Sequence, residues 1–395
     1  MTFEPRVASF KRLLLSLVLL SCLGGLFYTF YKPTRSWLSF PNASVSTHEV
    51  LTDECLKTSK EKFVQKSNKT ETLDDFLVKQ QQLINKPNTI EEYKEIDDII
   101  MLIWTWPGDY KFSGEACISE FGIPGCQITD DRSQYDKAHG VMFHQRDISR
   151  DLQNLLKMPR PLHQKWVWLN MESPSNSKRW PELDGLFNLT SNYRRDSDVW
   201  VPVGKIVEAP EKNNTFKIPP KDKLVCWIVS NWKAKYERVR YFNELSKHIK
   251  IEAYGRHFNR PISRDDYNKI LKSCKFYLSF ENSIHKDYFT EKVFNPLKLG
   301  TVPVVLGPPR QNYEEFIPPD SFIHVNDFKS PQKLAEHLMF LDKNQKVYEQ
   351  YFNWRKHFIA IRARFGLEHT CRSCEHIRSD KRYKVFKDLT KWYWG

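Results

Sequence analysis

Short apolar runs alternate with helix-like stretches over most of the chain, and this alternation limits the fold more than any other feature. Three strand-like runs come first and five follow a polar, proline-containing connector: 99–106, 140–144 and 165–171, then 224–230, 251–255, 275–280, 301–307 and 321–325. Helical patterns such as 236–249 and 331–352 lie between or after them. Strands alternating with helices predict parallel sheets covered by helices. Two such series predict two Rossmann-like α/β domains facing a cleft in which a ligand binds.

The N-terminal region predicts a membrane anchor. Residues 13–31 are nineteen positions without a charge. At about 1.5 Å per residue a helix of this length spans roughly 28 Å, close to the ~30 Å hydrocarbon core of a bilayer. We expect a cytoplasmic tail at 1–12, one transmembrane anchor and a lumenal body. A cleaved signal peptide is the alternative, but its apolar part normally ends in small residues, and here it ends in aromatic ones.

Residues 32–95 are polar and offer little from which to build a core, so we expect a stem between the anchor and the body. Cys55 lies in this stem without an obvious partner. It could join two chains into a homodimer.

Cysteines and glycosylation sequons agree with a lumenal body. Six of the eight cysteines lie beyond residue 100, and an even set in a lumenal domain favours disulfides. The pair Cys371-Arg-Ser-Cys374 could instead be half of a zinc site or a redox pair, but no second ligand pair accompanies it. Four acceptor sequons fit a secretory chain: Asn42, Asn68, Asn188 and Asn213.

The net charge of +13 indicates that the protein binds anionic partners, which can be nucleic acid, an acidic membrane or a phosphate-bearing substrate. A lumenal body argues against nucleic acid. The sequence has no GxGxxG, Walker or HExxH motif, so nicotinamide, P-loop and zincin chemistry have no support. Asp196-Ser-Asp198 could hold a divalent metal on a diphosphate. The favoured alternative is that these acids pair with Arg194 and Arg195.

The segment 275–307 is the most informative for chemistry. A buried strand ends in a polar loop at 281–290, and a helix begins near Thr290. Such a loop at the carboxyl end of a parallel strand can bind phosphates and ribose at the helix N-terminus. Lys292 offers a cation, Glu291 can bind sugar hydroxyls, and Asn282 and Tyr288 offer hydrogen bonds. An ordinary surface loop is the alternative.

The run FENSIHKDYFTEK, followed by VPVVLG, resembles the signature of the α1,3-fucosyltransferases, inverting enzymes of the two-domain GT-B architecture. NMESP, NYRRDSD, VSNW and CRSC occur in the same order, so the resemblance covers about residues 97–395. It implies an acceptor-binding domain at 96–210, a GDP-fucose-binding domain at 222–365 and a tail at 366–395 that packs back on the first domain. It also implies a type II protein of the Golgi membrane.

The resemblance implies that seven residues contact GDP-fucose: Ser230, Asn231, Arg238, Asn282, Tyr288, Glu291 and Lys292. An enzyme of this kind works without a metal, so cations and helix N-termini must neutralise the leaving diphosphate, and Arg238 and Lys292 can do so. We therefore expect no required cofactor or metal, and Mn²⁺ stimulation is not predicted.

The resemblance also assigns the catalytic base to Glu172. This residue follows an aromatic strand, where a carboxylate would face the cleft and take the proton of the acceptor hydroxyl. A β-linked donor would then give an α-fucoside by a single displacement with inversion. The alternative is that Glu172 only caps the turn before Pro174.

Gln145, Arg146 and Asp147 match an acceptor-side motif of the family. Relatives that also use type 1 chains have Trp at the position of Arg146, so we expect transfer to O3 of GlcNAc in type 2 N-acetyllactosamine on glycoproteins or glycolipids. An acceptor in the N-glycan core, a protein acceptor and a non-catalytic glycan-binding protein are the alternatives.

The resemblance further implies disulfides of Cys117 and Cys126 with Cys371 and Cys374, and one between Cys226 and Cys274. Two positions depart from the family. Val203 replaces the usual Tyr, which puts one donor contact in doubt. Pro296 replaces the usual Ala, and we place it in the first turn of the helix, where proline is tolerated.

Overall fold

The computed structural model describes residues 98–149, 151–210 and 216–395, and all of them fall in one compact unit of the chain. The predicted tail, anchor and stem lie outside the described residues, as do Cys55, Asn42, Asn68 and Asn213. Within the described ranges, none of the helices combines the length and the apolar character needed to cross a bilayer.

The first sheet has six parallel strands in the order β2-β1-β3-β4-β5-β6. Its central strands β3 and β4 are almost wholly buried, as continuous apolar runs in a parallel sheet should be. The bounds are β1 (Ile99–Ile103), β2 (Cys126–Thr129), β3 (Gly140–His144), β4 (Lys165–Asn170), β5 (Leu189–Asn192) and β6 (Val199–Trp200).

The second sheet has five parallel strands in the order β12-β11-β10-β8-β9. The strand order reverses between β8 and β10, and ligands of such sheets bind at this switch point, outside the carboxyl ends of the strands. The bounds are β8 (Lys223–Ile228), β9 (Ile251–Tyr254), β10 (Cys274–Phe280), β11 (Val302–Leu306) and β12 (Ile323–His324).

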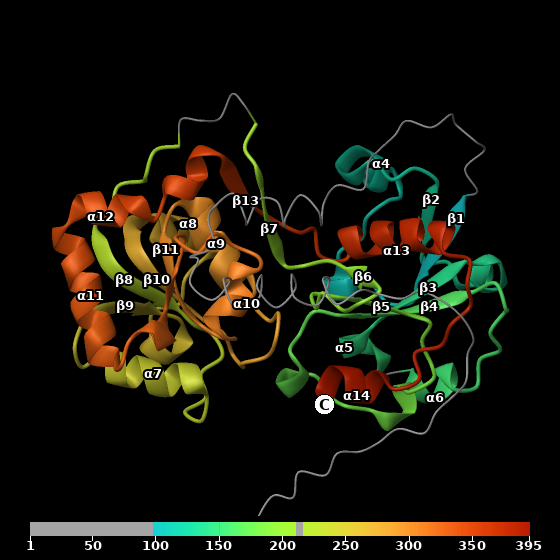
Figure 1. Ribbon diagram of the computed structural model, residues 1–395. Coiled ribbons are helices and arrows are strands. Elements are labelled where there is room, and N and C mark those ends of the chain that lie inside the picture. Colours follow the sequence, from blue (N-terminus) through green and yellow to red (C-terminus); the bar gives the residue numbers. More distant parts are fainter. Residues whose placement is uncertain (1–97, 150, 211–215) are drawn as a thin grey trace, which may run out of the picture. The chain divides into compact units, whose positions relative to one another are not determined.

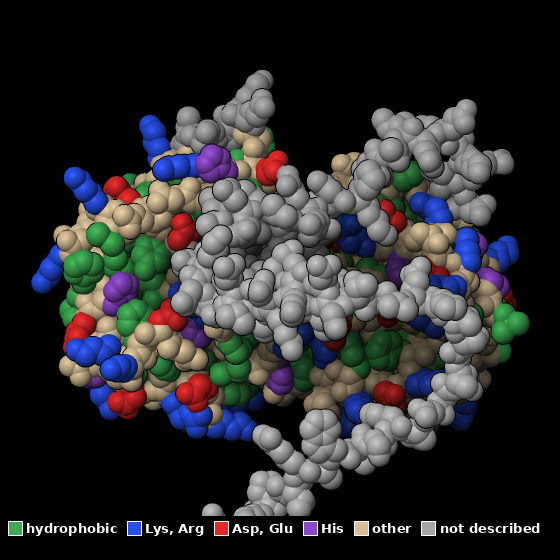
Figure 2. All heavy atoms as spheres, in the orientation of Figure 1, with side chains coloured by type: hydrophobic (Ala, Val, Ile, Leu, Met, Phe, Trp, Pro, Cys, Tyr) green, Lys and Arg blue, Asp and Glu red, His purple; other side chains and the backbone are tan. Residues whose placement is uncertain are grey.

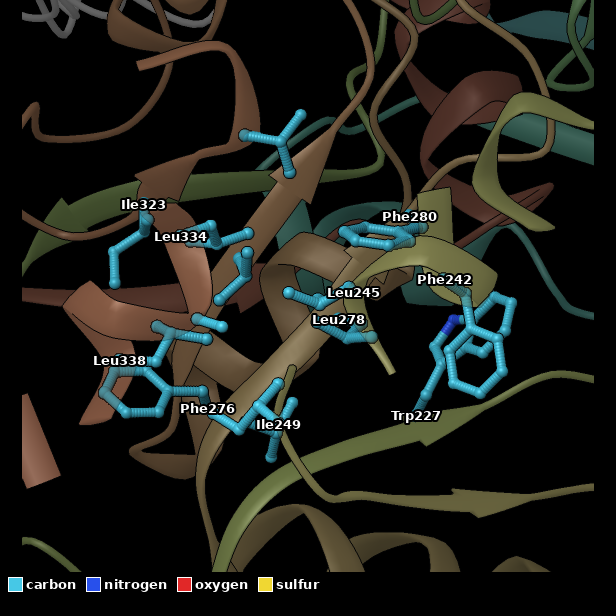
Figure 3. Packing of buried hydrophobic residues seen from close by; sticks show 14 of the residues in the cluster. Trp227, Phe242, Leu245, Ile249, Phe276, Leu278, Phe280, Ile323, Leu334 and Leu338 are labelled. Atoms are coloured by element: carbon cyan, nitrogen blue, oxygen red, sulfur yellow. The ribbon is translucent and has the colours of Figure 1, made fainter. Parts of the chain in front are cut away.

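Helices cover the sheets, as Figure 1 shows. In the second sheet, alternate residues of β10 enter different clusters: Phe276, Leu278 and Phe280 pack with α7 and α11 (Figure 3), while Tyr277 packs with α8 on the other face. The bounds are α4 (Glu115–Phe121), α5 (Gln145–Ile148), α6 (Leu152–Leu155), α7 (Glu237–Leu245), α8 (Arg264–Ser273), α9 (Glu291–Leu299), α10 (Arg310–Glu314), α11 (Pro331–Lys343), α12 (Gln345–Gln350), α13 (Leu367–Ser379) and α14 (Leu389–Trp394).

The α/β prediction with parallel sheets is confirmed, and each of the eight predicted runs contains a strand. The antiparallel ribbon of β7 (Gly204–Glu208) and β13 (Phe358–Arg362) was not predicted. Its two strands are about 150 residues apart in sequence, and a pairing over such a distance is not visible in a local sequence pattern.

The C-terminal segment packs on the first sheet, where α13 contributes Leu367, Cys371, Cys374 and Ile377 to a cluster with β1. Disulfides link Cys117 to Cys371 and Cys126 to Cys374, and a third joins β8 to β10 through Cys226 and Cys274. Cys371 and Cys374 are therefore bonded to other elements rather than to each other or to zinc. Each disulfide closes a long loop, and closing such a loop is expected to stabilise the folded protein by about 2–5 kcal/mol.

Candidate active site

A pocket of about 880 Å³ lies at the switch point of the second sheet. It is lined by residues that follow β8 and β10, by the N-terminus of α9, by Arg238 of α7 and by Glu172, which follows β4 of the first sheet. Six of the seven predicted donor ligands line it: Ser230, Asn231, Arg238, Asn282, Glu291 and Lys292. Tyr288 lines an adjoining hollow instead.

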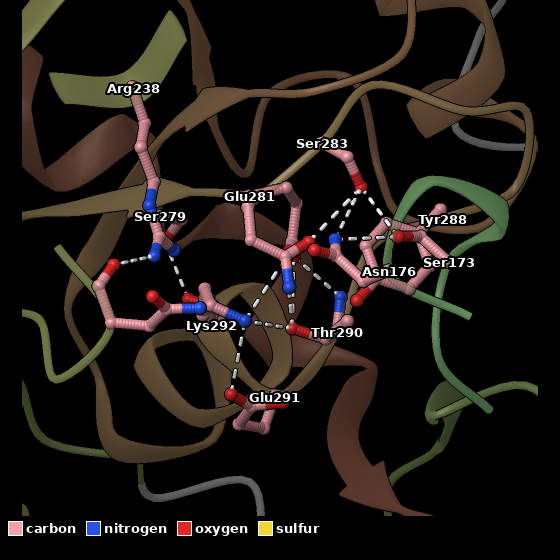
Figure 4. A network of polar contacts seen from close by, with 12 residues as sticks. Ser173, Asn176, Arg238, Ser279, Glu281, Ser283, Tyr288, Thr290, Glu291 and Lys292 are labelled. Carbon is pink, nitrogen blue, oxygen red and sulfur yellow. Dashed lines mark hydrogen bonds and ion pairs between the residues drawn. The ribbon is translucent and has the colours of Figure 1, made fainter. Parts of the chain in front are cut away.

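Lys292 is held in a cage of oxygen atoms at the N-terminus of α9 (Figure 4). Its Nζ lies 2.8 Å from Oγ1 of Thr290, 3.1 Å from Oε2 of Glu281 and 3.2 Å from Oε1 of Glu291. Burial alone would lower the pKa of Lys292, but the two carboxylates outweigh it and raise that pKa well above its usual range. The pocket therefore contains a permanent cation.

Glu281, which the sequence did not single out as a site residue, organises this cage. Its side chain is buried and accepts hydrogen bonds from the backbone nitrogen of Thr290 at 2.7 Å and from Oγ1 at 3.0 Å. Burial raises the pKa of Glu281, while Lys292 opposes the shift. The signal was present in the sequence as an acid that directly follows a buried strand.

The structure corrects the placement of Pro296. It lies in the second turn of α9, inside the helix, where proline removes one backbone hydrogen bond. The carbonyl left without that partner is the one of Lys292, four residues earlier. This carbonyl instead accepts a 2.6 Å hydrogen bond from Oγ of Ser279 on β10. The bond joins β10 to α9 at Lys292.

Arg238 supplies a second cation, with only 4% of its surface exposed. One guanidinium nitrogen donates to the carbonyl of Asn231, but buried Nε has no partner among the described residues. Burial lowers the pKa of Arg238, and Glu281 opposes this. Because arginine stays charged in proteins, a buried cation with an unused donor lines the pocket.

Glu172 lies where the two sheets' loops meet. Its Oε1 accepts hydrogen bonds from the Tyr288 hydroxyl at 2.6 Å, the Ser173 nitrogen at 2.9 Å and Nδ2 of Asn282 at 3.3 Å. Its backbone carbonyl accepts from the hydroxyl of Tyr393. Within the described ranges Oε2 has no partner. The hydrogen bond from the Ser173 nitrogen is the capping contact that the sequence offered as the alternative role of Glu172. The side chain is nevertheless exposed and lines the pocket.

An unusual backbone conformation brings Tyr288 to Glu172. Asp287 has a φ of 60°, and its backbone nitrogen donates to Oδ1 of Asn312 at 2.7 Å while Nδ2 of Asn312 donates back to Oδ1 of Asp287. Burial raises the pKa of Tyr288 well above its usual range, and the nearby carboxylates of Glu281 and Glu172 add to the shift. Tyr288 is therefore a neutral hydrogen-bond donor.

The adjoining hollow measures about 240 Å³ and shares Glu172, Asn282, Glu291 and Lys292 with the larger pocket. Val203, one of the two departures from the family, lines this hollow. Arg362 at the end of β13 lines both spaces, and no sequence argument identified it because its ribbon was missed.

Gln145, which we expected on the acceptor side, is buried within the fold. This residue is 3% exposed, its Oε1 accepts from the indole of Trp168 at 2.6 Å, and its Nε2 donates to the carbonyl of Lys178 at 2.8 Å. Its amide is used inside the fold and is not offered to a ligand. Asp147 pairs with Nδ1 of His144 at 2.7 Å, and Arg146 is exposed on α5. None of the three lines the two pockets.

The Asp-x-Asp motif is used structurally. Asp196 pairs with Arg194 at 2.6 Å, whereas Asp198 accepts from the backbone and hydroxyl of Thr190 and pairs with Lys384. The expected pairing with Arg195 is wrong, because Arg195 pairs with Glu315. In the part of the chain that the structure describes, no group of three or more His, Cys, Asp or Glu side chains is placed to hold a metal ion.

The sequon at Asn188 is also used inside the fold. The side chain is 1% exposed, its Nδ2 donates to the carbonyl of Lys384 at 2.7 Å, and its Oδ1 accepts from the backbone nitrogen of Trp166 at 2.8 Å. A glycan on this nitrogen would have to displace the C-terminal segment. The burial of this side chain therefore argues against a glycan at Asn188.

These features together define a class of protein. A switch-point pocket with two fixed cations suits a nucleotide diphosphate, and a carboxylate with a free oxygen beside it suits proton removal from an attacking hydroxyl. The fold and site are those of a transferase for nucleotide-activated groups.

Sequence comparison identifies the family within this class. Residues 97–204 match the family model described as fucosyltransferase, N-terminal, and residues 218–392 match that of the C-terminal part of glycosyltransferase family 10 (fucosyltransferase). The chain belongs to glycosyltransferase family 10, the fucosyltransferases.

Relatives extend over nearly the whole chain. It is 42% identical over 378 residues to 4-galactosyl-N-acetylglucosaminide 3-alpha-L-fucosyltransferase 9 of Homo sapiens, covering 96% of each chain. It is 42% identical over 298 residues to 3-galactosyl-N-acetylglucosaminide 4-alpha-L-fucosyltransferase FUT3 of Bos taurus, covering 74% of this chain and 81% of the relative. The fold matches a crystal structure of an α1,3-fucosyltransferase with GDP-fucose at a TM-score of 0.50, with 14% identity over 76% of this chain and 96% of that chain.

Proposed function

We propose that the protein transfers L-fucose from GDP-β-L-fucose to O3 of GlcNAc in type 2 N-acetyllactosamine, giving a Lewis x-type product. The observation that carries this proposal is the position of Glu172, whose Oε2 has no partner among the residues that the structure describes and which lines a pocket with Arg238 and Lys292. The acceptor follows the human relative, whose name specifies a 4-galactosyl-N-acetylglucosaminide and a 3-alpha linkage.

The reaction is a single displacement. O3 of the acceptor forms a bond to the anomeric carbon of fucose while the bond from that carbon to the β-phosphate oxygen breaks. Glu172 takes the acceptor proton, and GDP leaves with the electron pair. Inversion at the anomeric carbon converts the β-linked donor into an α-fucoside.

The protein's own cations stabilise the departing diphosphate. Arg238 has an unused donor, and Lys292 is fixed at the N-terminus of α9, where the helix dipole adds positive potential. Charge that develops on the leaving group is therefore met by groups already in position. We propose on this basis that transfer requires neither a metal nor a cofactor.

We also propose the GT-B architecture, with an acceptor-binding domain at 96–210, a GDP-fucose-binding domain at 222–365 and a tail at 366–395. Support comes from the two parallel sheets and from the pocket lined by loops of both. We place the protein in the Golgi membrane as a single-pass type II protein, following its family and the apolar segment at 13–31.

Other acceptors are weighed against this proposal. The bovine relative is named for a 3-galactosyl acceptor and a 4-alpha linkage, and Arg146 in place of Trp favours the type 2 acceptor over it. A polyanion-binding protein is less favoured, because basic and acidic side chains are intermixed on the described face in Figure 2. A non-catalytic glycan-binding protein has no need for a fixed base beside two cations.

The decisive experiment measures fucose transfer by the full chain in detergent with EDTA present. The acceptors are type 2 lactosamine, type 1 lactosamine and an N-glycan core, and Glu172→Gln is the paired variant. We expect transfer to O3 in type 2 alone, and a fall in turnover of roughly 10²- to 10⁴-fold in the variant with unchanged GDP affinity. GDP binding without transfer to any acceptor would overturn the proposal.

A further inference from the structure

Phe365 is an exposed aromatic side chain in the hollow next to Glu172. It lies in the turn between β13 and α13, lines the 240 Å³ hollow, and keeps 42% of its surface exposed. Isolated exposed apolar side chains are common and carry no meaning by themselves. Phe365 differs from these because it faces a hollow that holds the proposed base.

The ring of Phe365 is held in place from two sides. The imidazole of His144 meets it at 5.8 Å between centroids and 69° between planes, and that of His369 at 6.1 Å and 80°. Both contacts are edge-to-face, an arrangement that aromatic pairs favour. His144 is fixed by Asp147 at 2.7 Å, and His369 by the hydroxyl of Ser191 at 2.8 Å.

The backbone of this turn is equally constrained. Gly366 has a φ of 79°, and a Cβ at this position would lie 2.9 Å from Cγ of Pro107. Only glycine fits such a turn without strain. The position of Phe365 therefore depends on residues 144, 366 and 369 together, which is more support than an incidental surface side chain has.

The chemistry of the hollow fits a sugar ring. A pyranose has an apolar C–H face and a rim of hydroxyls. The hollow offers the apolar side chains of Phe365, Met171 and Val203 together with the polar groups of Glu172 and Arg362. The hollow shares Lys292 and Arg362 with the larger pocket but is not lined by Arg238, Ser230 or Asn231. At about 240 Å³ against about 880 Å³ it has room for a sugar ring rather than for a whole nucleotide diphosphate.

We propose that Phe365 is the platform on which the acceptor sugar stacks, with the hydroxyl to be deprotonated directed at Glu172. This inference rests on the proposed function and adds a specificity-determining residue to it. The predicted acceptor-side segment then acts on the acceptor indirectly. Asp147 fixes His144, and His144 in turn packs against Phe365.

The test compares Phe365→Ala and Phe365→Trp with a matched control, Phe340→Ala. Phe340 lies on α11 and is 49% exposed, so its removal leaves transfer unchanged. We expect Phe365→Ala to raise the KM for type 2 lactosamine roughly tenfold, with GDP and GDP-fucose affinities within twofold of wild type. Phe365→Trp, which keeps a flat face, should retain most of the acceptor affinity.

Saturation-transfer NMR of the lactosamine in the presence of GDP separates this inference from the proposed function, because it needs no turnover. Loss of the acceptor signal in Phe365→Ala alone supports the platform. An unchanged signal or an unchanged acceptor KM overturns it, as does an effect confined to donor affinity. Absence of turnover by the wild-type chain would overturn the proposed function, while the NMR comparison would still test the platform.

Discussion

The hydroxyl of Tyr288 donates a 2.6 Å hydrogen bond to Oε1 of Glu172, so a residue from the loop after β10 fixes a carboxylate that follows β4. Since burial raises the pKa of Tyr288 well above its usual range, the phenol stays protonated and keeps donating at any working pH. Oε1 is thus occupied, and Oε2, which has no partner in the described part of the chain, is the oxygen to which the proposed function assigns the acceptor proton.

Replacing Tyr288 by Phe should lower kcat without weakening GDP binding. The change removes a hydrogen bond to a charged group, which is worth about 1.5–3 kcal/mol, so kcat should fall roughly 10- to 100-fold. The measurement is steady-state transfer together with calorimetric titration of GDP. If Tyr288 instead contacts GDP-fucose, as the resemblance implies, KM for the donor would rise with little change in kcat.

The hydrogen bond from Ser279 to the Lys292 carbonyl, which Pro296 leaves without a helical partner, leads to a prediction about stability. Ser279→Ala should leave the Lys292 carbonyl without a partner and destabilise the protein by about 1–3 kcal/mol. In a Pro296→Ala background, residue 296 regains a backbone N–H that can bond this carbonyl, so the same Ser279→Ala change should cost less. Urea unfolding of the four variants gives the coupling energy. Strictly additive costs would contradict the proposed link.

The sequence predicted the strands of the second sheet well, because strong apolar runs there end directly in polar residues. Asn282, Glu291 and Lys292 line the pocket where the loop and helix N-terminus were expected. Glu281 was not singled out although it directly follows a buried strand, because that position alone does not distinguish a buried acid from an exposed one. Strand β5 was not predicted because three of its four residues, LTSN, are polar although all four are buried.

The acceptor side was predicted less well because it depends on long-range contacts. Gln145 looks like a ligand in sequence, but its partners Trp168 and Lys178 lie 23 and 33 residues away. Phe365 and Arg362 come from a segment more than 180 residues after Glu172. Pairing of β13 with β7 and the disulfides of α13 bring them to the site, and a single sequence does not specify that pairing.

His369 predicts a pH dependence of stability. It is fully buried, and burial lowers its pKa to about 3, while Glu368 opposes the shift and His144, Lys205 and Arg372 reinforce it. Between this value and the unfolded pKa near 6.5, the unfolded chain binds a proton that the folded chain does not. Stability is therefore lost as the pH falls through this window.

The size of this effect can be measured by difference. From pH 7 to pH 5, His369 should cost the wild-type protein about 2 kcal/mol of unfolding free energy. His369→Gln, which does not titrate, should lose about that much less over the same interval. Contributions of the carboxylates are common to both proteins and cancel in the comparison. Parallel losses in the two proteins would show that His369 binds its proton in the folded state as well.

Asn188 provides a prediction that separates a structural role from glycosylation. Because Asn188 bonds both the backbone nitrogen of Trp166 and the carbonyl of Lys384, Asn188→Gln should destabilise the fold by about 3 kcal/mol, as expected when buried polar groups lose their partners. The Lys384 contact joins the C-terminal segment to the first sheet, so this segment should become sensitive to protease in the variant.

A second measurement tests directly whether Asn188 carries a glycan. Endoglycosidase treatment and peptide mass spectrometry of the full wild-type chain, expressed in cells that carry out N-glycosylation, should find residue 188 unmodified, since its side-chain nitrogen is buried under the chain at Lys384. Asn213→Gln is the control, because it removes a sequon without removing either of these bonds. A glycan on Asn188 in folded, active protein, with stability unchanged in Asn188→Gln, would show that the side chain is outside the fold and that the C-terminal segment packs differently.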